Sequence, residues 1–163
     1  MDLVLRQFEE RDLSQMNAIW NSIVEEGDAF PQTERLDMAS GLAFFRSQSF
    51  AGVAEDRNTG NIAGLYILHP NNVGRCSHIA NASYAVAETA RGRQVGRQLV
   101  THCLSKAKAL GFRILQFNAV VKTNTAAIRL YRALGFTPLG VIPGGFLKKD
   151  GTYEDIIPFY KTL

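Results

Sequence analysis

The stretch that decides the fold reads Val86-Ala87-Glu88-Thr89-Ala90-Arg91-Gly92-Arg93-Gln94-Val95-Gly96-Arg97. Before it lies an apolar, β-favouring run from Ile79 to Val86. After it comes a helical pattern that ends at Gly111 and has one apolar face, formed by Val95, Leu99, Cys103, Ala107 and Leu110. The first N–H groups of a helix have no internal partner and carry partial positive charge, while nearby glycines and arginines allow close, bidentate contact with oxygens. The stretch therefore predicts an anion-binding turn between a strand and a helix.

The distribution of charge supports a polyanionic ligand. The net charge is only +3, from 18 basic and 15 acidic residues. However, the segment from Thr89 to Lys149 holds 11 Lys and Arg and no Asp or Glu, which leaves 7 basic and 15 acidic residues, a balance of −8, for the rest. Such a basic half suits a nucleotide-like cofactor, although scattered solvated charge on the backs of helices would explain part of it. Aromatic residues do not interleave with the basic ones, so we expect no nucleic-acid partner.

Composition indicates one globular domain that covers residues 1–163. Apolar residues make up 46% and charged residues 20%, which is ordinary for such a protein. No apolar run is long enough for a membrane span, and two cysteines without metal-ligand spacing fit neither a disulfide framework nor a metal site. We therefore expect a reduced, cytoplasmic protein without a metal or a membrane partner.

The remaining pattern predicts an α/β fold with a mixed central sheet of about seven strands and four helices. Further strands are expected at Leu3 to Phe8, Phe50 to Glu55, Asn61 to Leu68, Arg113 to Val121, Phe136 to Ile142 and Asp155 to Tyr160. A first helix is expected after Asp12, which would cap it together with Gln15. Two more are expected from Glu34 to about Ser47, with Thr33 as the cap, and from Asn124 to Gly135. A loop is expected from Pro143 to Gly151. The central strand–helix–strand crossover implies one parallel pair among antiparallel neighbours.

The anion turn resembles a known cofactor loop. It contains neither a G-x-x-x-x-G-K-[ST] motif nor a G-x-G-x-x-G motif with a later acidic residue. Instead, Arg91-Gly92-Arg93-Gln94-Val95-Gly96 is similar to the R/Q-x-x-G-x-G/A loop of the GNAT superfamily of N-acetyltransferases, with Gln94 in place of the middle glycine. The resemblance implies acetyl-CoA as cosubstrate and cofactor contacts from Arg91, Gly92, Arg93, Gln94, Val95, Gly96 and Arg97. It also implies that Tyr84, Ala85 and Val86 align the pantetheine arm, with a main-chain N–H near Val86 as donor to the oxyanion.

A second segment resembles the same family. The run from Asn124 to Phe136 matches the GNAT pattern N-x-x-A-x-x-L-Y-x-x-x-G-F at every named position, and the element order matches over nearly the whole chain. The resemblance implies that Asn124 lies beside the cofactor arm and that Tyr131 acts as the general acid that protonates the thiolate leaving group. A tyrosine, with a pKa near 10, is a suitable acid for a thiolate of comparable basicity. The alternative is a half-buried helix tyrosine anchored by its hydroxyl.

The general base stays open at this point. Many GNAT relatives carry a glutamate on the fifth strand, five residues before the motif asparagine, and this chain has Ala119 there. The candidates are Glu25, Glu26, His78 and Glu154, or a chain of water molecules.

Three amides suggest a polar acceptor. Asn81, Gln116 and Asn118 fall in strands that should be covered on both faces, so they would bind either a ligand or one another and nearby carbonyls. The runs His78-x-x-Asn81-Ala82 and Phe117-Asn118-x-Val120-x-x-x-Asn124 are similar to the fungal GNAT branch that acetylates proline analogues. This likeness implies that the asparagines contact a small cyclic amino acid.

The sequence thus predicts an acyl-CoA-dependent N-acetyltransferase that acts on the primary or secondary amine of a small molecule, such as an amino acid. Acetylation of a protein N-terminus or lysine, and a CoA-binding module without turnover, are the alternatives. A homodimer stays open. The long segment from Gly144 to Asp155 favours a closed, small-molecule cleft over an open peptide groove.

Overall fold

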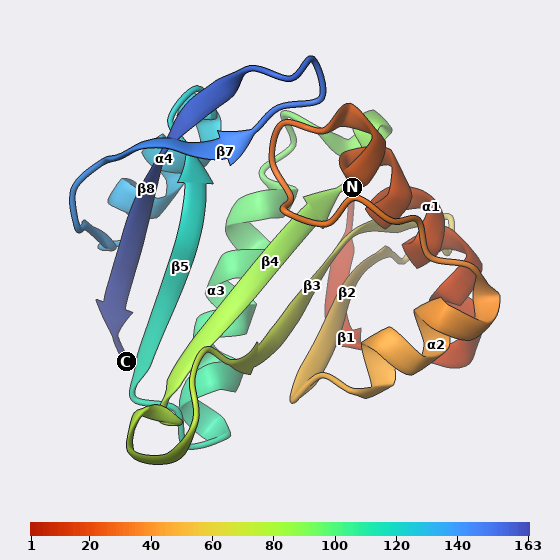
Figure 1. Ribbon diagram of the computed structural model, residues 1–163. Helices are drawn as coiled ribbons and strands as arrows, with labels where there is room; N and C mark the ends of the chain where they lie inside the picture. Colours follow the sequence, from red (N-terminus) through yellow and green to blue (C-terminus); the bar gives the residue numbers. More distant parts are fainter.

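The computed structural model describes residues 1–163 as one eight-stranded mixed sheet with four α-helices (Figure 1). The helices are α1 (Leu13–Glu26), α2 (Met38–Arg46), α3 (Val95–Ala109) and α4 (Thr125–Ala133). The strands are β1 (Leu3–Gln7), β2 (Phe50–Asp56), β3 (Ile62–Pro70), β4 (Ile79–Val86), β5 (Ile114–Val121), β6 (Thr137–Pro138), β7 (Ile142–Leu147) and β8 (Tyr153–Thr162). This confirms the predicted mixed α/β fold with four helices. None of the helices has the length and hydropathy of a membrane span.

The strand order is β1-β2-β3-β4-β5-β8-β6, and β7 pairs with β8. All pairs are antiparallel except β4 with β5, which are joined through α3 as the crossover rule requires. The two faces of the sheet carry separate cores. Cys103 and Leu99 of α3 belong to the core on one face, and Trp20 of α1 and Phe45 of α2 belong to the core on the other.

The sheet opens between its two central strands. The β4–β5 ladder contains only the pairs Ile79 with Ile114 and Ala80 with Leu115, after which the strands diverge, as Figure 1 shows. On the far side of β5, the register with β8 shifts by one residue between Phe117 and Val120, which is a β-bulge. The fold therefore leaves a gap in the middle of the sheet with free strand edges.

The predicted start of the second helix is wrong. Helix α2 begins at Met38 rather than Glu34, because Asp37 is its cap: the Ser40 N–H donates to Asp37 Oδ1 at 2.7 Å, and the Asp37 N–H donates to Ser40 Oγ at 2.9 Å. The preceding residue, Leu36, is held in place by both ends of the buried Asn21 amide. A side chain from α1 thus fixes the segment that the sequence pattern placed inside a helix.

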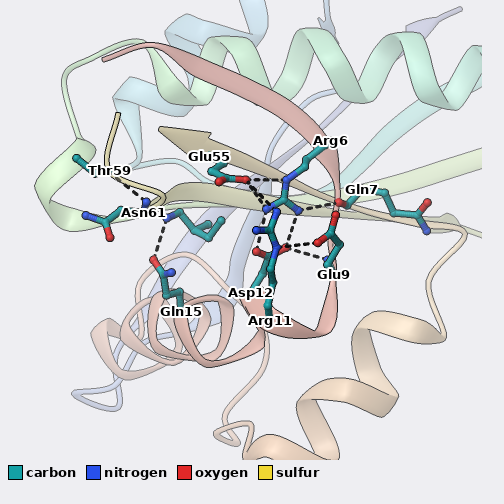
Figure 2. A network of polar contacts seen from close by, with 10 residues as sticks. Arg6, Gln7, Glu9, Arg11, Asp12, Gln15, Glu55, Thr59 and Asn61 are labelled. Atoms are coloured by element: carbon teal, nitrogen blue, oxygen red, sulfur yellow. Dashed lines mark hydrogen bonds and ion pairs between the residues drawn. The ribbon is translucent and has the colours of Figure 1, made fainter. Parts of the chain in front are cut away.

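The predicted cap of the first helix is right in position only, because Asp12 directly precedes α1 but its side chain does not cap it. Asp12 makes no capping bond to α1; both of its oxygens accept hydrogen bonds from the Arg6 guanidinium, at 2.7 and 2.9 Å (Figure 2). Arg6 also donates to Glu55 of β2 at 2.8 Å, and Gln15 accepts instead from the Ile62 N–H. Although burial alone would raise it, the pKa of Asp12 is lowered overall by these donors and the nearby arginine charge. Arg6 therefore joins three segments of chain: β1, the start of α1 and β2.

The C-terminal hairpin departs from the predicted pattern as well. The expected strand from Phe136 to Ile142 is reduced to the two residues of β6, and the expected loop from Pro143 is part of β7. Because β7 pairs only with β8 and its register is irregular between Ile142 and Phe146, it tolerates a proline and two glycines.

Candidate active site

The gap between β4 and β5 presents unpaired main-chain groups. Hydrogen bonds from Ala87 N–H to Ala63 and from Asn71 N–H to Ile79 fix which residues of β4 bond to β3. By antiparallel alternation, the N–H and C=O groups of Tyr84 and Val86 point the other way, into the gap beyond the end of the β5 ladder. Those of Ala85 face β3, and its side chain is buried. Tyr84 and Val86 therefore line the gap, and Ala85 supports it.

A cavity of about 190 Å³ fills the narrow part of this gap. Its walls come from β4, β5, α4 and the connection after α1, which crosses the end of β4 in Figure 1. The lining includes Ala29, Phe30 and Pro31 from that connection, Asn81 to Tyr84, Phe117 to Val121, Asn124, Ala127 and Tyr131. No Asp, Glu, His, Lys or Arg is among them. We call this cavity the inner pocket.

Tyr131 projects from α4 into the inner pocket. Its ring packs 4.4 Å, centroid to centroid, from Phe117 and 6.5 Å from Tyr84. Asn124, at the cap of the same helix, accepts from the Ala127 N–H at 3.2 Å, so α4 starts at the pocket wall. Burial raises the pKa of Tyr131 above its ordinary value near 10. Its phenol therefore keeps its proton throughout the physiological range.

A second tyrosine of the pocket lining, Tyr84, has a buried hydroxyl without a conventional hydrogen bond. This hydroxyl lies beside the weakly polar Cys103 thiol, and the Tyr84 ring lies between those of Tyr66 and Tyr131. Burial raises the pKa of Tyr84 and raises the pKa of the neighbouring Cys103 thiol to about 12. Both groups are thus neutral at physiological pH.

The predicted anion turn has an open helix end. Gln94 precedes α3 with φ 60°, the only non-glycine residue of the chain at positive φ, and its side chain makes no capping bond. The first turn of α3 contains no acidic residue, and the first main-chain bond of the turn runs from Gln98 N–H to Gln94. The preceding N–H groups are therefore free to bind an anion.

The three arginines of the turn differ in their partners. Arg93 and Arg97 are exposed and make no ion pair. Arg91 donates to Glu26 at the end of α1, at 2.7 Å, in a second opening of the gap that also contains Asp28, Val86 and Asn124. This pair raises the pKa of Arg91, with smaller contributions from Glu88 and Asp28. Arg93 and Arg97 are thus the available cations, and Arg91 ties the turn to α1.

These features fit a bound acyl-CoA. The free N–H groups of α3, Arg93 and Arg97 would hold the pyrophosphate, and Gly92, at φ 76° with open space around it, leaves the turn accessible. The exposed main-chain groups of Tyr84 and Val86 would hold the pantetheine arm as a strand-like partner. Gln94, which stands in place of the middle glycine of the GNAT loop, already adopts the left-handed conformation that a glycine would take.

The three predicted amides are only partly brought together. Gln116 Nε2 donates to Asn118 Oδ1 at 3.1 Å, and Asn118 Nδ2 donates to Asn71 Oδ1 at 2.7 Å. Asn118 and Asn81 line the inner pocket, whereas Gln116 does not. Asn81 makes no side-chain hydrogen bond within the chain, so its amide is free for a ligand.

None of the predicted bases lines the inner pocket. Glu25 pairs with Arg35, Glu26 pairs with Arg91, and His78 precedes β4 at the closed end of the gap, where its carbonyl accepts from Arg113. Glu154 lies on β8 beside β7. No group of three or more His, Cys, Asp or Glu lies close enough together to hold a metal ion.

Sequence reasoning missed two contributors to the site. The segment Ala29 to Pro31 follows the end of α1 and carries no motif, and Asn71 lies in a loop 47 residues before its partner Asn118. Only the apolar pair Phe30-Pro31 next to the helix-ending Gly27 could have drawn attention to that segment.

Comparisons with known proteins identify the family and the fold. The family model described as "Acetyltransferase (GNAT) family" matches residues 13–136. The chain is 32% identical over 162 residues to N-acetyltransferase aca1 of Schizosaccharomyces pombe, covering 90% of this chain and 78% of the relative. A GCN5-related N-acetyltransferase from Kribbella flavida superimposes with a TM-score of 0.90 at 33% identity, over 99% of this chain and 98% of the other. A phosphinothricin acetyltransferase from Sinorhizobium meliloti, solved with acetyl-CoA, shares the fold at a TM-score of 0.91 and 23% identity, over 100% and 89% of the two chains.

Proposed function

The chain belongs to the GNAT family of acetyltransferases, and on this premise we propose that it moves the acetyl group of acetyl-CoA directly onto the primary or secondary amine of a small molecule, such as an amino acid or its analogue. The observation that carries this proposal is the inner pocket, where Tyr131, Asn81 and Asn118 meet beside the free main-chain groups of Tyr84 and Val86.

The size and closure of the pocket favour a small acceptor over a peptide. The inner pocket holds only about 190 Å³, and the connection after α1 forms one wall. The hairpin of β7 and β8 reaches the end of α1, just before this connection, since Lys149 Nζ donates to the Glu25 carbonyl at 3.1 Å. An extended peptide would need an open groove at this position.

Each residue of the site has a proposed role. Acetyl-CoA supplies an acetyl group activated as a thioester, held by Arg93, Arg97 and the start of α3. A main-chain N–H of Tyr84 or Val86 can donate to the acyl oxygen as negative charge develops there, a contribution of about 3 kcal/mol for a preorganised donor. Tyr131, protonated at physiological pH, can give its proton to the departing sulfur.

The amine enters this pocket as the neutral base. No titratable group other than tyrosine lines the inner pocket. The proton that the amine nitrogen loses on acetylation therefore goes to water rather than to a side chain. Asn81 and Asn118 can bind the polar groups of the acceptor through their amides, and precise alignment of the two reactants supplies much of the rate. The kcat/KM for the acceptor should therefore rise with pH as the free amine loses its proton.

The experiment that tests the proposal is Tyr131→Phe. We expect turnover to fall on the order of 10²-fold, because general acid catalysis is lost, while acetyl-CoA affinity stays unchanged. The matched control is Tyr153→Phe, which removes a hydroxyl from a side chain that is 68% exposed on β8. Unchanged turnover in Tyr131→Phe, with single-turnover rates that show chemistry to be limiting, would assign Tyr131 to the core instead.

A further inference from the structure

The side chain of Asn118 projects from a part of β5 that neither neighbouring strand holds. The β4–β5 ladder ends at the pair of Ala80 with Leu115. On the other side, the register between β5 and β8 shifts between Phe117 and Val120, so Asn118 falls within the β-bulge and has no partner in that register. Asn118 is also exposed, although β5 is a central strand. Strand pairing therefore leaves the direction of this side chain weakly determined.

Two other amides hold Asn118 instead. Gln116 Nε2 donates to Asn118 Oδ1 at 3.1 Å, and Asn118 Nδ2 donates to Asn71 Oδ1 at 2.7 Å. Gln116 lies in register with Tyr160 of β8, so its main chain is fixed. One partner therefore belongs to the same strand as Asn118, and the other belongs to the connection between β3 and β4. Together the two bonds restrict rotation of the Asn118 amide.

Asn71 is itself anchored at the closed end of the gap. Its N–H donates to the Ile79 carbonyl at 2.7 Å, which continues the β3–β4 pairing beyond the end of β3. In the same register, His69 is opposite Asn81, which lines the inner pocket. Because side chains two residues apart share a face of a strand, Asn71 lies on the same face of the sheet as Asn81. The main chain thus fixes the amide to which Asn118 donates.

The direction of these bonds leaves Asn118 with one free donor. Its Nδ2 carries two N–H groups, and Asn71 accepts from one of them. Asn118 lines the inner pocket, whereas neither Gln116 nor Asn71 does. The second N–H is thus available to an oxygen of a molecule in the pocket. A ligand that must first order an exposed side chain loses about 2- to 10-fold in affinity, and the two existing bonds avoid this loss.

We propose that Asn71 is a positioning residue for the acceptor: it holds the Asn118 amide in place, so that the remaining N–H of Asn118 donates to an oxygen of the bound amine substrate. The inference rests on the proposed function, which assigns Asn118 to the acceptor, and it extends the site to the connection between β3 and β4. Asn71 itself contacts neither the acceptor nor acetyl-CoA. Its effect is therefore confined to acceptor binding and acts entirely through Asn118.

Kinetic constants of single and double variants test this role. The acceptor is whichever of azetidine-2-carboxylate, proline, glycine and glutamine has the highest kcat/KM in the wild type, with acetyl-CoA saturating. Asn71→Ala should raise the acceptor KM about 2- to 10-fold and leave kcat and the KM for acetyl-CoA unchanged. Adding Asn71→Ala to Asn118→Ala should have no further effect, because the interaction is already lost. An unchanged acceptor KM, a fall in kcat, or independent effects of the two substitutions would overturn the proposal.

The matched control lies one residue later. Asn72→Ala removes the same side chain from the same connection, but the Asn72 oxygen accepts from the Val73 N–H and makes no bond to Asn118 or Gln116. This variant should keep the acceptor KM of the wild type, and thermal unfolding shows whether each variant is folded. A KM that rises equally in Asn72→Ala and Asn71→Ala would assign the effect to the whole connection and overturn the role of Asn71.

A spectroscopic measurement separates this inference from the proposed function. The side-chain N–H₂ signals of Asn118 are followed by NMR in isotope-labelled protein without ligand and are assigned by their loss in Asn118→Ala. Asn71→Ala should shift these signals and speed their exchange with water, whereas Asn71→Asp keeps an accepting oxygen and should preserve slow exchange. This result supports the positioning of Asn118 even if no amine is acetylated and the proposed function is wrong. Signals that are the same in the wild type and in Asn71→Ala overturn the inference.

Discussion

Replacing Gln94 by glycine is expected to stabilise the protein, against the usual effect of that change. Gln94 has φ 60°, and a non-glycine residue in this region costs about 1–2 kcal/mol. Glycine removes this strain, but it also gives the unfolded chain more conformational entropy, which lowers the stability of the fold by about 0.4–1 kcal/mol. Because Gln94→Ala keeps the strain, Gln94→Gly should be more stable than Gln94→Ala by about 0.5–1 kcal/mol.

Gln98 provides the matched control on the same helix. It is exposed and lies within α3, where glycine is less favourable than alanine by about 1 kcal/mol. The two glycine-minus-alanine differences should therefore have opposite signs. Urea and thermal unfolding of the four variants measure both differences, and 1 kcal/mol corresponds to roughly 2–4 °C in Tm for a chain of this size. A loss at Gln94 equal to that at Gln98 would refute the left-handed turn.

Three further changes test other parts of the structure. Tyr84→Phe should leave the free energy of unfolding within about 0.5 kcal/mol of wild type or raise it, because the hydroxyl has no partner; a loss above about 1 kcal/mol in urea unfolding would reveal a hydrogen bond. Asp12→Asn should reduce stability at pH 7 and flatten its decline in acid: the folded pKa of Asp12 is lowered, so its contribution is present above the unfolded pKa of about 3.9 and is lost as pH falls through the folded value. A decline of unaltered steepness between pH 5 and pH 2 would contradict this. Asn118→Ala should weaken the acceptor about 5- to 150-fold and leave acetyl-CoA affinity unchanged in separate titrations; equal weakening of both ligands would show that Asn118 only braces its amide partners.

The central strand, turn and helix could be predicted closely from the sequence because their signals are local. Strand β4 has the predicted bounds, and α3 begins at Val95, where the apolar periodicity begins. Apolar pattern, glycine positions and helix length all agree in this stretch. The open start of α3, where we expect an anion to bind, followed from the same signals because a helix end is a local feature.

The errors arise where a distant partner decides the structure. Asp12 has the local pattern of a helix cap, but its carboxylate pairs with Arg6 of β1, which also binds Glu55 of β2. The prediction that Arg91 contacts the cofactor stays a prediction, but the local pattern did not indicate its pair with Glu26, which lies 65 residues earlier in the chain. Lys149 reaches the Glu25 carbonyl across 124 residues. Such contacts depend on the path of the whole chain, which no local pattern records.

The most direct test of acetyl transfer to a small amine is release of free CoA from acetyl-CoA, followed by thiol titration across a panel of amino acids, polyamines and peptides, with the products identified by mass. We predict thiol release well above the rate without acceptor for at least one amino acid, a product heavier by one acetyl group on nitrogen, and no comparable release with peptides or polyamines. Thiol release that only peptides stimulate, or that no amine raises above the background, would contradict the assignment of the inner pocket as the site of a small acceptor.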